Sequence, residues 1–118
     1  RRVRPSQVVV PNVVEAYNEV FRKMGAQHPN LSTGMAALVI LLELEAPAQV
    51  WLAGFDKVLD PTSKGYISTV PSPFNDGGHK DTGHDWKAEC RMLAFLQQHF
   101  ADTPIRDLAH AEDLICSP

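Results

Sequence analysis

Residues 32–56 read STGMAALVILLELEAPAQVWLAGFD, and they decide the fold of this chain. A hydroxyl side chain at the start can cap a helix that runs to about Ala46, where a proline follows. The first half of this helix is apolar on every side, which predicts that it is buried against a sheet. Residues 49–53 then read as a central strand, which Gly54 closes. A helix and a strand joined by a short connection are typical of a layered α/β fold.

Upstream of this stretch, the sequence predicts a strand and a helix. Residues 7–10 read as a short buried strand that the following proline ends. Asn12 is the predicted N-cap of the helix, with Glu15 completing a capping box. Apolar residues recur at helical spacing up to Gly25, which is a stop signal. The connection over residues 26–31 is expected to be irregular.

Downstream, residues 55–83 are rich in proline and glycine, and we predict a long, flexible functional loop. A helix is expected from about Asp85 to Ala101. Residues 105–109 are a candidate edge strand, and residues 111–115 a helical turn.

The whole sequence has the composition of a single globular domain or part-domain. Its 118 residues are 44% hydrophobic and 21% charged, with a net charge of −3, which argues against disorder. No basic stripe follows the arginines at positions 1, 2 and 4, so no nucleic-acid partner is expected. No apolar run is long enough to span a bilayer. The abrupt start on Arg1 suggests a piece of a longer chain, with an N-terminal half or an oligomer partner elsewhere.

The two cysteines, Cys90 and Cys116, are too few for a disulfide framework. Cys90 falls on an apolar helix face and reads as a small core residue. A reducing or redox-indifferent compartment fits this usage, and a cytoplasmic or membrane-peripheral bacterial location is favoured over secretion.

The glycine-rich segment before the last long helix carries the candidate chemistry. It delivers His79 and His84 to the start of that helix, where the helix dipole favours a neutral imidazole that can accept a proton. Asp85 and Glu89 lie one turn apart on a common face. Glu89 either ties the loop, orients His84 or is solvated.

Two further segments could bind a ligand. Residues 32–34, Ser32, Thr33 and Gly34, begin a helix whose free N–H groups can bind an anion, although such residues are more often only a cap. His28 lies shortly before them and could approach the same site. Asp56 follows the carboxyl end of the predicted strand at Gly54, where it could hold a substrate hydroxyl or simply bond its own backbone.

A metal site is the main alternative. His79, His84 and the carboxylates Asp81 and Asp85 are possible ligands of zinc or manganese. Their spacing matches no compact metal motif, so no metal is expected.

Together these segments resemble the sialyltransferases. Residues 29–35, PNLSTGM, with the apolar helix and the strand ending in Gly54-Phe55-Asp56, look like the family's small sialyl motif. Residues 83–89 look like its very small motif, a histidine followed by a glutamate. The similarity covers residues 28–100.

The resemblance implies an inverting glycosyltransferase with a Rossmann-like fold, a mostly parallel sheet flanked by helices. The enzyme would transfer a sialic acid or related sugar from a CMP-sugar donor to a glycan acceptor, with no further cofactor. His84 would be the general base. Donor-binding residues would be Ser32, Thr33, Gly34, Gly54, Asp56 and His79, with Asp85 and Glu89 supporting them.

The chain departs from the family in two places. The large sialyl motif, which should precede Arg1, is missing, and the paired aromatics that hold the donor phosphate are not evident. Only Tyr66 and Phe74 lie in that loop, with His79 as a candidate substitute. The rival interpretations are a metal-dependent hydrolase using His79 and His84, and a non-catalytic binding domain that has kept the fold.

Overall fold

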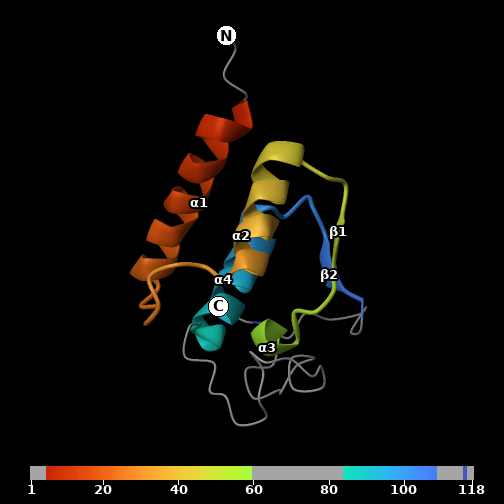
Figure 1. Ribbon diagram of the computed structural model, residues 1–118. Helices are drawn as coiled ribbons and strands as arrows, with labels where there is room; N and C mark the ends of the chain where they lie inside the picture. Colours follow the sequence, from red (N-terminus) through yellow and green to blue (C-terminus); the bar gives the residue numbers. More distant parts are fainter. Residues whose placement is uncertain (1–4, 60–83, 109–115, 117–118) are drawn as a thin grey trace, which may run out of the picture.

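A computed structural model describes residues 5–59, 84–108 and 116 of the chain (Figure 1). The described part is a small, mostly helical α/β structure. Its elements, in chain order, are α1 (Pro5–Lys23), α2 (Thr33–Ile40), the π-helical turn η1 (Leu41–Glu45), β1 (Val50–Leu52), α3 (Asp56–Leu59), α4 (Trp86–His99) and β2 (Ile105–Asp107).

The two strands form a parallel pair in which Val50 lies opposite Ile105 and Leu52 opposite Asp107. These four residues are buried, whereas Trp51 and Arg106 lie on the exposed face, with the guanidinium carbon 5.8 Å from the centre of a Trp51 ring. Parallel strands need a long crossover connection, and α4 lies within it. The predicted strands at 49–53 and 105–109 are confirmed, each with fewer residues than expected.

Helix α4 organises the core, since it contacts α1, α2 and α3. In Figure 1, α4 lies behind α2, α1 lies beside α2, and the strands lie on the other side. Met92, Leu93 and Leu96 of α4 have no exposed surface, and neither do Phe21, Met35 and Val39 from α1 and α2. The start and end of α4 agree with the helix predicted from about Asp85 to Ala101.

The strand predicted at residues 7–10 is wrong, because these residues belong to α1. Pro11 lies inside this helix, where it is exposed and removes a single helical hydrogen bond. Asn12 is therefore an interior residue and not a cap, and Glu15 pairs with Arg22 at 2.8 Å. The valine-rich sequence favours a strand locally, but packing of the following turns outweighs that weak preference.

The predicted extent of the helix that ends near Ala46 is confirmed, but the helix packs mainly against α1 and α4 and not against the sheet as predicted. It continues from α2 into η1, and Ala46 ends it in the left-handed conformation with φ of 43°. The Tyr17 hydroxyl donates a hydrogen bond of 2.5 Å to the Glu43 carboxylate and so joins α1 to η1. Burial, and then the Glu43 carboxylate, raise the pKa of Tyr17 above its ordinary value.

The loop predicted over residues 55–83 is wrong at its start, because Asp56–Leu59 form the short helix α3. The carbonyl of Phe55 accepts hydrogen bonds from the N–H groups of Val58 and Leu59. Residues 60–83 and the helical turn predicted at 111–115 lie outside the described residues.

The interpretation of Cys90 as a small core residue missed its pairing, since Cys90 and Cys116 form a disulfide. The bond joins α4 to a residue 26 positions later in the sequence, and Cys116 is buried, with its sulfur 3.7 Å from the carbonyl oxygen of Val58. Sequence spacing does not reveal the pairing, because it depends on the later chain returning to α4.

Reduction of this disulfide should lower the free energy of unfolding by about 3 kcal/mol, because the crosslink restricts the unfolded chain over a loop of this size. Urea denaturation with and without a thiol reductant measures the loss. The Cys90→Ser variant should be as unstable without reductant as the reduced wild type. Equal denaturation midpoints in all samples would contradict the expected crosslink.

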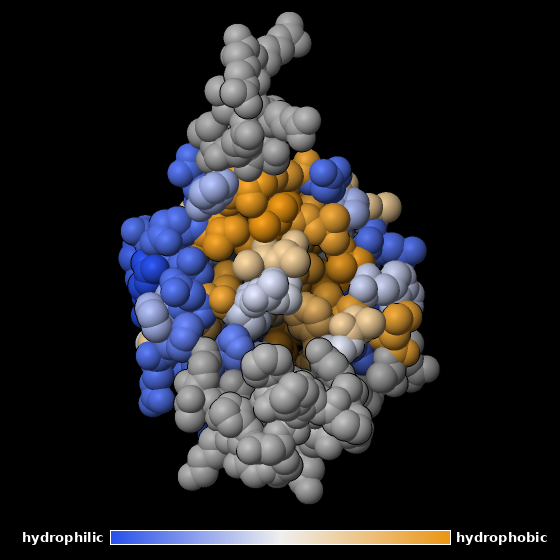
Figure 2. All heavy atoms as spheres, in the orientation of Figure 1, coloured by the Kyte–Doolittle hydropathy of each residue, from blue (hydrophilic) through white to orange (hydrophobic). Residues whose placement is uncertain are grey.

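Among the described residues, no helix combines the length and apolar character needed to cross a membrane. Figure 2 shows that apolar atoms nevertheless gather over α2 and the adjacent side of α1, while polar atoms cover the outer side of α1. Leu41 and Leu44 of η1 are 36% and 41% exposed.

Candidate functional site

The first turn of α4 is held to the connection between α1 and α2 by Asp85. The carboxylate of Asp85 caps α4 by accepting from the N–H of Ala88 at 3.1 Å. Its second oxygen accepts from the N–H of Gln27 at 2.9 Å. The Gln27 hydrogen bond is the main reason that the pKa of Asp85 lies below its ordinary value. Asp85 therefore both begins the helix and positions the connecting segment.

Glu89, one turn later, makes the second link. The residue is 1% exposed, and its carboxylate accepts hydrogen bonds from the N–H of Ser32 at 3.2 Å and from the Ser32 hydroxyl. The Ser32 oxygen also accepts from the N–H of Met35 and so caps α2. The prediction that Glu89 is solvated is wrong, because its carboxylate binds Ser32 at the start of α2. Its predicted tie to the glycine-rich loop before α4 concerns residues outside the described part and stays a prediction.

Burial raises the pKa of the Glu89 carboxyl above its ordinary value. The two hydrogen bonds from Ser32 and the charges of His84 and His28 act in the opposite direction.

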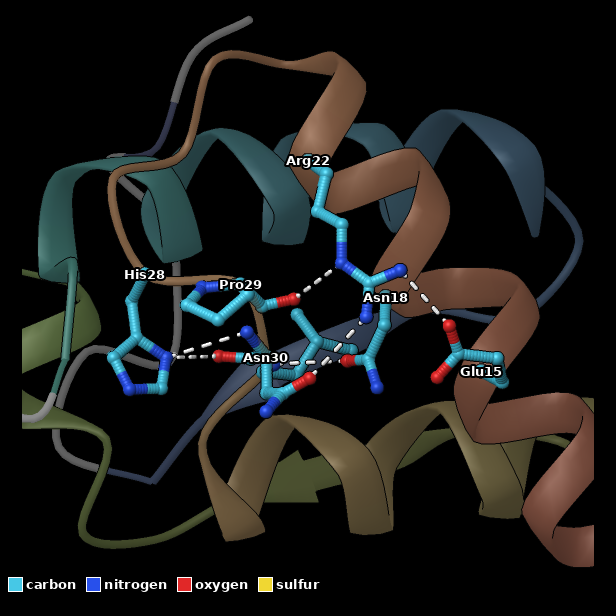
Figure 3. A network of polar contacts seen from close by, with 7 residues as sticks. Glu15, Asn18, Arg22, His28, Pro29 and Asn30 are labelled. Carbon is cyan, nitrogen blue, oxygen red and sulfur yellow. Dashed lines mark hydrogen bonds and ion pairs between the residues drawn. The ribbon is translucent and has the colours of Figure 1, made fainter.

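Helix α1 fixes the other side of the same connection (Figure 3). Arg22 donates to the carbonyl of Pro29 at 2.9 Å, and the buried Asn18 accepts from the N–H of Leu31 at 2.9 Å. Residues 27–32 are therefore held by α1 and α4 together. Sequence reasoning missed Asn18 and Arg22, since both read as ordinary polar residues of a helix.

An aromatic cluster lies where the connection meets α4. The ring centres of His28 and His84 are 6.0 Å apart, and those of His84 and Trp86 are 4.7 Å apart. His84 is exposed and precedes the cap of α4, as predicted, whereas His28 and Trp86 are partly buried. Within the described part of the chain, Trp86 Nε1 is a buried nitrogen without a hydrogen-bond partner. His28 therefore lies near His84, and its expected approach to residues 32–34 stays a prediction.

The carboxyl end of β1 reaches the start of α2 through Phe55. A Cβ atom on Gly34 would lie 3.3 Å from the Phe55 ring, so a larger side chain at position 34 would displace this ring. Gly54, with φ of 76°, makes the turn that leads out of the strand. The absence of a side chain on Gly34 therefore has a packing role at this junction.

The structure brings together most of the predicted site. Ser32 and Glu89 are in direct contact, Asp85 and His84 adjoin them, and Thr33 is exposed on the first turn of α2. Asp56 is the first residue of α3. His79 and Asp81 lie outside the described residues, and among those described no group of three potential metal ligands occurs.

Asp85→Ala should lower the free energy of unfolding by about 2 kcal/mol at neutral pH, because it removes a helix cap and a second backbone hydrogen bond. The pKa of Asp85 is lowered in the folded protein. Its contribution to the free energy of unfolding is therefore complete above the ordinary pKa of 3.8 and is lost as the pH falls through the lowered pKa. Urea denaturation across the acidic range checks both statements. The prediction fails if the free energies of unfolding of wild type and variant differ by the same amount at neutral and at strongly acidic pH.

No protein-family model, curated protein or solved structure matches this chain significantly.

Proposed function

We propose that this chain contributes the catalytic half of a sialyltransferase-like, inverting glycosyltransferase with a Rossmann-like core. The observation that carries the proposal is the contact between Ser32 and Glu89. It joins the two segments that resemble sialyl motifs, although 57 positions separate them. The two strands, parallel as in a Rossmann-like sheet, support the same assignment.

In this proposal, His84 accepts the proton of the acceptor sugar hydroxyl as that oxygen attacks the anomeric carbon of the donor. A general base must reach its substrate within hydrogen-bond distance, and His84 is exposed at the start of α4. The leaving CMP phosphate requires stabilisation of its negative charge and no proton.

In this proposal, the donor binds at the start of α2. The Ser32 hydroxyl already donates to Glu89 and accepts from Met35, so Ser32 shapes this end of the helix. Thr33 and Gly34 are exposed beside it, and the first N–H groups of a helix have no partner within the helix. These groups, with Gly54, Asp56 and His79, are the proposed contacts to the donor.

Release of CMP from CMP-sialic acid, measured with and without a galactose-terminated acceptor, tests the proposed function. Acceptor-dependent CMP release is expected. A protein that binds CMP without any turnover would support the non-catalytic alternative, and turnover that requires added zinc or manganese would support the metal-dependent one.

A further inference from the structure

His28 has no role in the transfer chemistry described above, yet the fold places its ring beside the proposed base. We infer that His28 is a second ligand-contacting residue, whose Nε2 atom binds an anionic group of the donor next to His84. The inference rests on the proposed function, since the anion is that of a CMP-sugar.

Among the residues that the structure describes, the hydrogen bonds of His28 use Nδ1 and leave Nε2 available. Its Nδ1 atom lies 2.9 Å from the carbonyl oxygen and 3.3 Å from the N atom of Asn30. Figure 3 shows that both contacts involve the same side of the ring. In the tautomer in which Nδ1 accepts from the N–H of Asn30, Nε2 carries the ring proton and is a donor, as binding to an anion requires.

The position of His28 is fixed from both neighbouring residues. Gln27 donates its N–H to Asp85, and Arg22 donates to the carbonyl of Pro29 at 2.9 Å. A side chain held in this way loses little conformational freedom when a ligand binds. The cluster is therefore built before the ligand arrives.

The carboxylates near the two imidazoles already have hydrogen-bond donors. The Asp85 oxygens accept from two backbone N–H groups, and the Glu89 oxygen Oε1 accepts both donors of Ser32. Glu89 is also buried, whereas His84 is exposed. Because these carboxylates have their own donors, Nε2 of His28 remains, within the described part of the chain, as a polar group for a ligand, and an imidazole N–H forms a charge-assisted hydrogen bond with phosphate or carboxylate.

Two variants of His28 distinguish the contributions of its two ring nitrogens. Asparagine can reproduce the Nδ1 contact with Asn30 but has no group at the position of Nε2. Glutamine can place an uncharged amide donor near Nε2. His28→Asn should weaken CMP binding about tenfold, the loss expected for one charge-assisted hydrogen bond, and His28→Gln should weaken it less. His99→Asn is the matched control on an exposed histidine that stacks on Phe95 instead.

Calorimetric titrations with CMP, cytidine and free sialic acid identify the anion. If His28→Asn loses affinity for CMP but not for cytidine, the phosphate is the group that His28 binds. If it loses affinity for sialic acid, the carboxylate is that group. In turnover, His28→Asn should raise KM for the donor about tenfold and leave kcat nearly unchanged. If His28→Asn unfolds at the same temperature as the wild type, the loss of affinity is not caused by a loss of structure.

Wild-type affinity of His28→Asn for both CMP and sialic acid would overturn the assignment of His28 while leaving the transferase proposal intact. Failure of the wild-type protein itself to bind any of these ligands would overturn both.

Discussion

Alanine in place of His84 is expected to lower acceptor-dependent turnover of the CMP-sugar by roughly 100- to 10,000-fold, the usual contribution of a general base. His84 is exposed and lies outside α4, so the variant should unfold at the wild-type temperature. Affinity for CMP should remain within about twofold, because a base acts on the acceptor hydroxyl and contributes little to ground-state binding.

His99→Ala is the control for this experiment, since His99 lies in the last turn of α4, packed against Phe95 and Phe100. It should retain wild-type turnover. Unchanged turnover in His84→Ala would remove His84 from the mechanism, and an equal loss in both histidine variants would indicate a nonspecific effect.

Glu89→Ala is expected to lower the free energy of unfolding by about 4 kcal/mol, because it leaves two buried donors of Ser32 without an acceptor, each costing about 1–3 kcal/mol. The start of α2 should then separate from α4, and CMP binding should be lost with it. Urea denaturation at neutral pH measures the loss of stability, and the matched variant Glu89→Gln keeps an oxygen acceptor at the same place.

The pH dependence of Glu89→Gln has a defined sign. The folded pKa of Glu89 is raised above its ordinary value of 4.5. Protonated Glu89 therefore contributes to the free energy of unfolding. This contribution is complete below pH 4.5 and is lost as the pH rises through the pKa that Glu89 has in the folded protein. The glutamine variant should accordingly gain stability relative to wild type as the pH rises from acid to neutral. A constant difference between the two proteins would contradict the burial of an ionisable group at this position.

Sequence patterns were sufficient where one segment determines its own structure. The apolar helix after Ser32, the strand ending at Gly54 and the Asp85-capped helix each have a local stop or start signal, and all three are confirmed. Asp85 and Glu89 were expected on a common face, and the structure shows both accepting hydrogen bonds from the same connection.

The errors arose where distant contacts outweigh local preference. The valines of residues 7–10 favour a strand, but they continue a helix whose later turns bury Tyr17 and Phe21. The disulfide between Cys90 and Cys116 depends on the path of the chain after β2. The anchoring roles of Asn18 and Arg22 likewise require knowledge of where residues 29–31 lie. No local pattern encodes such proximity.

The indole N–H signals of the two tryptophans offer the most direct test of the central claim that a nucleotide binds where α2 meets α4. Trp86 contacts His84 in the proposed site, whereas Trp51 lies on the exposed face of the sheet with Arg106. In a nitrogen–proton correlation spectrum recorded during titration with CMP, we expect a saturable shift of the Trp86 signal and a constant Trp51 signal. A Trp86 signal that stays unchanged in a large excess of CMP would contradict it.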